Sequence, residues 1–415
     1  MIDIIDKKQC CGCGSCVQKC PKQCISLQED SEGFLYPKVD KVECVDCGLC
    51  TKVCPLLNQS SKIKPLKVLA AKNTDEKERM DSTSGGVFLP LAKEIIAQGG
   101  VVFGAVYDEC WEVHHVFAEK IEDVYPMMGS KYVQSRIENT YEEAENFLKQ
   151  GREVMFVGTP CQIAGLRTFL RNKEYPNLLT VDFVCHGVPS TGVWRRYLAE
   201  TYSGYNAKSK QSRLQAAAGK NTVLYSSLNA TSPIGDIKFR DKTESGWKKF
   251  RFVVLKKSAL KADKNSVLSS DIHYQNIYMK GFLTNIYLRP SCYDCKCKNG
   301  ANHCDLSLAD FWGINTVNPS FDDDKGVSLV LVFSEKGNSI LERLKLEVWN
   351  SDIETAKKFN PGMGETIPDN PFRMRFYIML NNGETVTDAI RKCYTPSFMG
   401  RCKSKLKKII KRIMK

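Results

Sequence analysis

Cysteines dominate the residues of this chain that could do chemistry. The sequence has 19 cysteines in 415 residues, and ten of them fall within the first 54. Eight of these ten form the pattern CxxCxxCxxxCP twice, and the two copies superpose at an offset of 34 residues. Cysteines at this density indicate either the disulfide scaffold of a secreted protein or a metal site. No apolar signal-peptide core follows Met1, so we expect reduced thiols and a metal site.

The spacing within each run predicts a pair of [4Fe–4S] clusters. Three closely spaced thiolates can hold three irons of one cube, whereas the fourth, beyond a short helical turn, points towards the other cube. Ligation is therefore predicted to cross between the runs. A pair of zinc sites is the alternative, but zinc sites rarely use four cysteines followed by proline. The predicted ligands are Cys10, Cys13, Cys16 and Cys54 for one cluster, and Cys44, Cys47, Cys50 and Cys20 for the other.

Two further cysteines of the head, Cys11 and Cys24, lie outside this ligand register, and we interpret them as packing residues. With both runs, residues 1–57 resemble the bacterial two-cluster ferredoxin module. That resemblance implies single-electron transfer at low potential.

Behind a polar linker at residues 58–65, short apolar runs alternate with amphipathic stretches, which favours an α/β sheet core. The predicted strands are Leu66–Ala71, Val101–Val106, Val154–Val157, Leu179–Val184, Phe250–Leu255 and Val327–Phe333. The predicted helices are Val87–Gln98, Tyr141–Gln150, Gln162–Asn172, Gly192–Tyr202 and Asn338–Glu347. The expected fold class is thus α+β or α/β, with a ferredoxin module followed by a mixed α/β domain.

Composition excludes two classes of protein and singles out the C-terminal tail. Hydrophobic residues at 42% and charged residues at 26% exclude wholesale disorder, and no apolar run reaches the length of a membrane span. The net charge of +13 is concentrated in residues 401–415, which hold eight Lys or Arg and no acid. Apolar residues recur there at helical spacing, which predicts an interfacial helix on an anionic membrane. A helix docked on its own domain is the alternative, and nucleic acid is disfavoured.

Five phrases in the body point to one family when they are taken together. They are TSGGVF (83–88), GSKYVQS (129–135), GTPCQ (158–162), CHGVP (185–189) and CYDC (292–295), the last followed by DLSLADFWG (305–313). In this order they resemble the coenzyme F420 hydrogenase/dehydrogenase beta-subunit family over residues 66–318. With the ferredoxin head in front, the chain is similar to bacterial members associated with polysaccharide biosynthesis. The predicted units are 1–57, 66–318, a C-terminal extension at 319–400, and the basic tail at 401–415.

The resemblance implies FAD. Ser84 to Gly86 stand before a helical stretch, where backbone N–H groups and the helix dipole favour a phosphate, although a plain helix cap has the same composition. Lys131 could face the flavin or its pyrophosphate, or be a solvated surface cation. The predicted flavin contacts are Ser84, Gly85, Gly86, Ser130, Lys131, Tyr132, Gly158, Thr159 and Pro160.

The same resemblance implies a third [4Fe–4S] cluster. Its ligands match Cys161, Cys185, Cys292 and Cys295 of this chain. Two alternatives stay open. Cys161 and Cys185 could be buried core thiols, or a local set could hold the cluster instead. That local set is Cys292, Cys295, Cys297 and Cys304.

His186, next to Cys185, is the candidate proton donor, because an unperturbed imidazole titrates near neutral pH. A hydrogen bond that supports the cluster is its alternative role. Asp310 could face a ribose or a substrate, or form a turn.

These patterns predict an iron–sulfur flavoprotein oxidoreductase that passes electrons between the head clusters and FAD. A redox partner protein or low-potential donor would supply or take electrons. The acceptor would be a small molecule, such as a deazaflavin or a sugar-linked substrate. The alternative is an electron-transfer subunit without substrate chemistry of its own. We expect a cytoplasmic protein, peripheral at the inner face of the membrane if the tail binds lipid.

Overall fold

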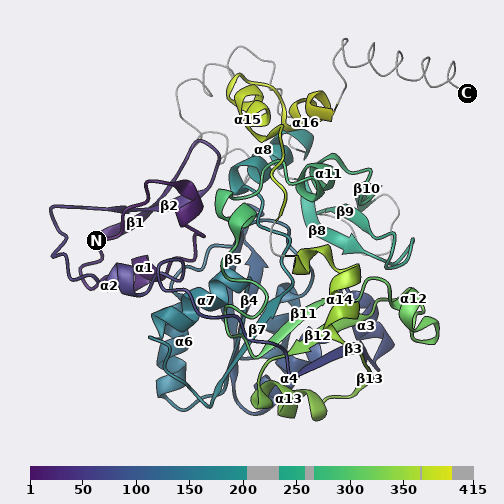
Figure 1. Cartoon of the computed structure of the whole chain (residues 1–415). Coiled ribbons are helices and arrows are strands. Elements are labelled where there is room, and N and C mark those ends of the chain that lie inside the picture. Colours follow the sequence, from purple (N-terminus) through teal and green to yellow (C-terminus); the bar gives the residue numbers. More distant parts are fainter. Residues whose placement is uncertain (203–232, 258–265, 365–366, 395–415) are drawn as a thin grey trace, which may run out of the picture.

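The structure is a computed structural model that describes residues 1–202, 233–257, 266–364 and 367–394. The strands in this part of the chain form three sheets, of two, three and eight strands. The cysteine-rich head, purple in Figure 1, lies against the side of a larger body. The expected fold class, a small head followed by a mixed α/β domain, is confirmed. The basic segment 401–415 lies outside the described residues, and within them no helix has the length and apolarity to cross a membrane.

The head consists of two short helices and a hairpin. Helices α1 (Ser15–Gln18) and α2 (Leu49–Lys52) each begin after a glycine in the left-handed conformation, Gly14 at φ 76° and Gly48 at φ 71°. Glycine adopts this conformation at little cost, which explains why both cysteine runs turn in the same way. Strands β1 (Ile25–Glu29) and β2 (Leu35–Val39) pair antiparallel.

The eight-stranded sheet is the centre of the body, with the order β13-β3-β12-β11-β7-β6-β4-β5. Parallel ladders join β4 to β6, β6 to β7 and β7 to β11, so the carboxyl ends of these strands meet at one edge. Ligands bind at that edge in open α/β sheets. The strands are β3 (Lys67–Asn73), β4 (Val101–Tyr107), β5 (Val113–Ala118), β6 (Val154–Val157), β7 (Leu178–Phe183), β11 (Leu306–Asp310), β12 (Ser328–Val332) and β13 (Leu346–Asn350).

Helices cover both faces of this sheet. Along β4, Val101 and Phe103 pack in one buried cluster with residues of α6 and α7, whereas Val102 packs in another with α4 and α13. Alternation of this kind is what a strand covered on both faces requires. The helices of this region are α3 (Glu76–Asp81), α4 (Phe88–Ala97), α5 (Ile121–Val124), α6 (Thr140–Lys149), α7 (Pro160–Phe169), α12 (Ile314–Val317), α13 (Glu335–Glu342) and α14 (Ile353–Phe359).

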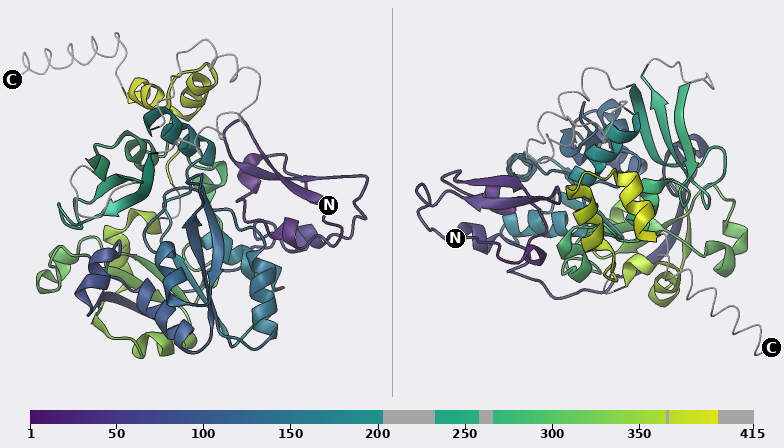
Figure 2. Two further views of the ribbon diagram at one scale, coloured as in Figure 1. Left: turned by 180° about the vertical axis from the view of Figure 1, so that it is seen from behind. Right: turned by 90° about the horizontal axis from the view of Figure 1, so that it is seen from above.

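A second layer of structure packs beside the carboxyl edge around buried aromatic rings. Trp194 contacts Tyr278 and Phe239, with ring centroids 4.9 and 5.2 Å apart. Figure 2 shows the two yellow helices, α15 and α16, above the main sheet. The elements are α8 (Thr191–Tyr202), β8 (Ile234–Asp241), β9 (Arg251–Lys256), β10 (Val267–Ile272), α11 (Ile277–Leu283), α15 (Arg373–Asn381) and α16 (Val386–Tyr394).

All six strands and five helices predicted from the apolar pattern are present, with ends shifted by a few residues. One end is clearly wrong. The helix predicted to reach Glu347 stops at Glu342, because Leu346 begins β13, which pairs with β3. Strands β12 and β13 follow residue 318 and belong to the same sheet as β3. The apolar pattern did not indicate β5, β8, β10, β11 or β13.

Candidate iron–sulfur and flavin sites

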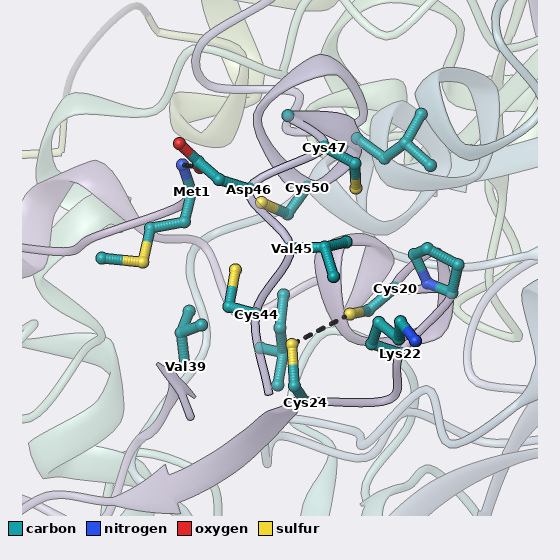
Figure 3. Close-up of a pocket in the computed structure, with 14 residues that line it drawn as sticks. Met1, Cys20, Lys22, Cys24, Val39, Cys44, Val45, Asp46, Cys47 and Cys50 are labelled. Carbon is teal, nitrogen blue, oxygen red and sulfur yellow. Dashed lines mark hydrogen bonds and ion pairs between the residues drawn. The ribbon is translucent and has the colours of Figure 1, made fainter. Parts of the chain in front are cut away.

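One pocket of the head gathers cysteines from both runs. Its wall includes Cys20 from the first run together with three cysteines of the second. The sulfurs face one another in Figure 3, and Cys47 is exposed to solvent. Cys24, interpreted above as a packing residue, also lines the pocket, with its sulfur 3.4 Å from that of Cys20. The pocket thus joins all four predicted ligands of one cluster: Cys20, Cys44, Cys47 and Cys50.

The other predicted set also crosses between the runs, but it is more buried. Burial raises the pKa of Cys16, and so do the nearby Cys13, Cys10 and Cys54. Burial likewise raises the pKa of Cys54 to about 11, with Cys13 and Cys10 acting in the same direction. Cys54 therefore lies among the cysteines of the first run. Cys13, Cys16 and Cys54 are all buried.

In the body, the structure brings the distributed cysteine set together. Cys161 lies in the first turn of α7 after β6, and Cys185 follows β7, so both stand at the carboxyl edge of the sheet. Burial raises the pKa of Cys185 far above its usual value, and the neighbouring Cys292, Cys161 and Cys295 raise it further. Backbone N–H groups of Gly187 and Val188 donate to the sulfurs of Cys185 and Cys292 at 3.3 and 3.4 Å.

The local alternative set is divided by the fold. Burial and then Asp182 raise the pKa of Cys304, and its other charged neighbours are Asp305 and Arg167 rather than cysteines. Cys297, by contrast, is buried close to Cys161 and Cys295. Of the two cysteines that belong only to the local set, Cys297 is within reach of the body site and Cys304 is not.

The head site and the body site adjoin each other through Cys11. Its thiol hydrogen-bonds to both Cys13 and Cys161, and these bonds, with burial, raise the pKa of Cys11 well above its usual value. The same hydrogen bond from Cys11 is the main cause that lowers the pKa of Cys13 to about 6 and lowers that of Cys161. Cys11 thus lies between a predicted ligand of the head and one of the body.

A buried lysine near the body cysteines indicates which kind of group this site fits. Lys298 is 5% exposed, and its ammonium has no hydrogen-bond partner in the described part of the chain. A buried charge without a partner is costly. Burial raises the pKa of Cys295, and the Lys298 ammonium opposes that rise, so the thiolates of this site are its counter-charge. The four cysteines and the unpaired ammonium therefore fit an anionic [4Fe–4S] centre. Within the described ranges no three His, Cys, Asp or Glu side chains converge as ligands of a single metal ion.

The residues predicted to hold the flavin lie at the carboxyl edge of the sheet, but several of their polar groups already form hydrogen bonds within the chain. The hydroxyl of Ser84 donates to the carbonyl of Val327, and the N–H of Gly85 donates to the hydroxyl of Ser328. Next to them, Gly86 has a left-handed φ of 82° and precedes α4.

The second group of predicted flavin residues belongs to α7 and the loop that leads into it. Thr159 caps α7 through a capping box with Gln162, and Pro160 is the first residue of that helix. A Cβ at Gly158 would meet Cβ and Oε1 of Gln162 at 3.1 Å, a tight contact. The side chain of Gln162 therefore already serves the start of α7.

The third group of predicted flavin residues lies against β8. Lys131 donates to the carbonyls of Met127 and Met128 at 3.3 and 3.0 Å, so it is not a solvated cation. Burial lowers the pKa of Lys131 to about 7. Tyr132 stacks on Phe282 at 4.7 Å. Ser130, beside them, is partly exposed.

Two cations of β8 and its end were missed by the sequence reasoning. Lys242 is 3% exposed and donates to the carbonyls of Arg79 and Ser84 at 2.6 and 2.9 Å. Burial lowers the pKa of Lys242 to about 7. Arg240 forms a two-bond ion pair with Asp310, which gives Asp310 a partner within the chain. The ammonium also donates to the carbonyl of Lys325, so backbone carbonyls accept from it on three sides.

His186 lies between the body cysteines and the aromatic layer. Its ring contacts Phe282 edge-on at 5.0 Å, and its Nε2 has no hydrogen-bond partner among the residues that the structure describes. Burial lowers the pKa of His186, so the imidazole is neutral near pH 7. The structure therefore places His186 beside Cys185 with one ring nitrogen available.

Two protein-family models match the chain. Residues 9–57 match the 4Fe-4S dicluster domain, and residues 151–355 match the C terminus of the coenzyme F420 hydrogenase/dehydrogenase beta subunit. The chain belongs to the F420 hydrogenase/dehydrogenase beta-subunit family. Both resemblances seen in the sequence are confirmed, and this family member is an iron–sulfur electron-transfer protein.

Curated relatives of this family member include two archaeal proteins. The coenzyme F420-dependent sulfite reductase of Methanocaldococcus jannaschii is 30% identical over 169 residues, which are 40% of this chain and 26% of that protein. The F subunit of the F(420)H(2) dehydrogenase of Methanosarcina mazei is 26% identical over 192 residues, 44% of this chain and 55% of that protein. The chain thus spans about a quarter and about half of their lengths.

A solved structure of the F420-reducing [NiFe] hydrogenase complex from Methanosarcina barkeri also resembles this family member. The identity is 17% and the TM-score 0.42, and the match covers 79% of this chain and 91% of that chain.

Proposed function

We propose that this chain is an FAD- and [4Fe–4S]-dependent oxidoreductase in which electrons pass between the head and FAD through a third cluster in the body. The observation that carries the proposal is the position of Cys11, which lies beside Cys13 of the head and Cys161 of the body. Two sites that share one hydrogen-bonded residue are close enough for electron exchange without a separate carrier protein.

The third cluster would be held by Cys161, Cys185, Cys292 and Cys295. Two backbone N–H groups, from Gly187 and Val188, donate to sulfurs of this set. Such bonds stabilise the charge of a cluster and orient its ligands. The unpaired ammonium of Lys298 favours the same anionic occupant.

FAD would bind at the carboxyl edge of the large sheet, where the predicted contacts gather around β8. Lys242 stands against the Ser84 loop, and Tyr132 lies beside Arg240. These two cations and Lys131 would face the phosphates or the flavin ring. Flavin suits this role because it accepts electrons singly and releases them in pairs. His186, neutral and with a free ring nitrogen, would hold or transfer the proton of the reaction.

The substrate would be a small organic acceptor or donor. Both curated relatives carry F420 in their names, which makes a deazaflavin coenzyme one candidate, and a sugar-linked molecule is the other. We place the protein in the cytoplasm. The basic tail would hold it at an anionic membrane surface, which liposome co-sedimentation of the full chain and a 1–400 truncation tests.

The second candidate function is an electron-transfer subunit that feeds a separate catalytic chain. It is favoured by one of the relatives, which is named as a subunit of a dehydrogenase. Chemically reduced protein distinguishes the two functions. An enzyme would be reoxidised by a small acceptor in repeated turnovers, whereas a subunit would keep its electrons until a partner protein is added.

The central experiment is a count of iron and flavin in full-length protein purified without oxygen. The intact chain should carry about twelve irons, four per cluster, and about one FAD. Cys161→Ala should lower the count to about eight irons while FAD is kept. Cys304→Ala is the matched control, a second buried body cysteine whose loss should leave about twelve.

Other results would contradict the proposal in distinct ways. Iron lost with Cys304→Ala and kept with Cys161→Ala would assign the cluster to the local set. About eight irons in the intact chain would leave only the head metallated. Zinc in place of iron, without flavin, would overturn the whole assignment.

A further inference from the structure

A buried arginine lies where the first cysteine run meets the body. Arg289 is 0% exposed. It comes directly after Leu288, which forms an isolated antiparallel β-bridge with Pro189. Its Nε donates to the carbonyl of Cys10 at 2.7 Å, and its Nη2 lies 3.5 Å from the sulfur of Cys10. A positive charge of the body thus lies beside a predicted cluster ligand of the head, Cys10, which is 279 residues away in sequence.

The other partners of this guanidinium are all neutral. Its Nη2 donates to the carbonyl of Leu35 at 2.9 Å, and its Nη1 donates to Oε1 of Gln134 at 3.0 Å. Its charge lies over the ring of Tyr36, 4.4 Å from the centroid. Among the described residues no carboxylate pairs with it. A buried guanidinium with only neutral acceptors is costly unless an anion compensates it, and thiolates are the anions at hand.

Arg289 lies beside cysteines of both the head site and the body site, because its Nη2 is 3.5 Å from the sulfur of Cys10 and its carbonyl accepts the N–H of Cys292 at 2.9 Å. Burial raises the pKa of Cys10 and that of Cys292, and the guanidinium opposes both rises. The hydrogen bond from Cys11 lowers the pKa of Cys13 and of Cys161, and the guanidinium adds to both effects. Within the described ranges, Arg289 contacts none of the cysteines in the open pocket of the head.

The backbone of the first run leaves room for this side chain at Gly12. A Cβ at Gly12 would meet Nη1 of Arg289 at 2.8 Å and Nε2 of Gln134 at 2.7 Å. Gly12 also has a left-handed φ of 74°. A larger residue would displace the guanidinium or the cysteine loop, so the approach of the charge is part of how this run is built.

We propose that Arg289 is a positioning residue that raises the reduction potential of the cluster held by Cys10 and of the body cluster, and leaves that of the open cluster unchanged. Reduction adds one electron to a cluster and makes it more negative. A fixed cation in a dry environment therefore stabilises the reduced form, and charge near the cluster is one of the levers that set its potential. The inference rests on the proposed clusters.

The test is a redox titration of full-length protein, followed by electron paramagnetic resonance of the reduced clusters. In Arg289→Gln, two of the three midpoint potentials should fall and the third should stay. A tenfold loss in the equilibrium constant for reduction corresponds to about 59 mV for one electron, and we expect at least that shift. Arg289→Lys keeps the positive charge, so its midpoint potentials should lie close to those of the wild type. A purely structural role of Arg289 would not predict this recovery.

Gln134→Glu tests the same idea without removing the arginine, so it decides the matter if Arg289→Gln fails to fold. A carboxylate beside the guanidinium should neutralise its field and lower the same two potentials. Lys22→Gln is the matched control, because it removes an exposed charge beside the open pocket. It should change each equilibrium constant less than threefold.

Unchanged potentials in every folded variant of Arg289 and Gln134, or an equal fall in all three, would overturn the proposal. A body without a cluster is recognised separately, since the untitrated wild type would then contain about eight irons. In that case only the cluster of Cys10 should shift, and its failure to shift would still count against Arg289.

Discussion

The two cysteine runs of the head have the same spacing but different surroundings. Gly12 of the first run has a φ of 74°. The equivalent residue of the second run, Asp46, lies in the same left-handed region at φ 46°. Gly12 faces the guanidinium of Arg289, whereas Asp46 is exposed and pairs with the N-terminal amine. One run is packed into the body, and the other opens to solvent through the pocket of Figure 3.

This difference separates two kinds of information in one motif. The spacing sets which cysteines can share a cube, and it does so equally in both runs. Position in the fold decides which cluster adjoins the body and which is open to a partner. The buried set, beside Cys11 and Arg289, is suited to exchange electrons within the chain. The open set, with Cys47 at the surface, is suited to exchange them with another protein.

Matched substitutions of Cys13 and Cys47 should show the largest difference between the two cysteine runs. Each occupies the second position of its run, and Cys13 is 8% exposed whereas Cys47 is exposed. Both changes to Ala should remove about four irons. Only Cys13→Ala should also weaken the anionic counter-charge of Arg289, which we expect to cost a further ~1–3 kcal/mol. Iron analysis and anaerobic thermal unfolding measure both effects, and equal melting temperatures would contradict the expectation.

A second comparison uses the equivalent positions 12 and 46. Gly12→Ala should lower the free energy of unfolding by about 2–3 kcal/mol, because it adds left-handed strain and crowds Arg289. Asp46→Ala should have little effect, since its side chain is 76% exposed and pairs with the N-terminal amine at the surface. Denaturant unfolding of the loaded proteins provides the measurement. A larger loss with Asp46→Ala would mean that the packing difference does not govern stability.

The two head clusters should also differ in how fast a chelator removes their iron. Cys47 opens one pocket to solvent, whereas Cys13, Cys16 and Cys54 are buried. A chelator should therefore remove about four irons per chain in a first phase, on the order of tenfold faster than the rest. Cys47→Ala should abolish the fast phase only. A single phase that releases all iron together would show that both head clusters are equally accessible.

The dependence of stability on acid pH reports on the body alone. His115 is 2% exposed, and burial lowers its pKa to about 4. Between about pH 6.5 and 4 the unfolded chain binds a proton that the native chain does not, so stability falls as the pH falls through this window. At most, the loss from His115 is about 3 kcal/mol.

His115→Gln should flatten that decline without changing the fast release of iron from the open pocket. Unfolding followed by intrinsic fluorescence at several pH values measures the slope. An unchanged slope would mean that His115 is already protonated in the native protein.

Local spacing determined much of what could be predicted. The ligands of the two head clusters, and the crossing of Cys20 and Cys54 between the runs, follow from distances along a short stretch of chain. The main strands and helices follow from apolar periodicity, because a covered strand or helix must present apolar residues at a fixed interval. Family phrases named the four body cysteines, which spacing alone could not have grouped.

Tertiary structure decided which parts of the chain meet. Arg289 reaches Cys10 across 279 residues, and Lys242 reaches the Ser84 loop across 158, although neither cation stands in a motif. Local pattern could not show that Gly12 makes room for a guanidinium or that Cys11 links two sites. Such contacts depend on how sheets and loops pack, and packing couples residues whose separation in sequence carries no signal. The spacing of the cysteines thus predicts which of them are ligands, and the fold places one predicted set in the interior and opens the other to the surface.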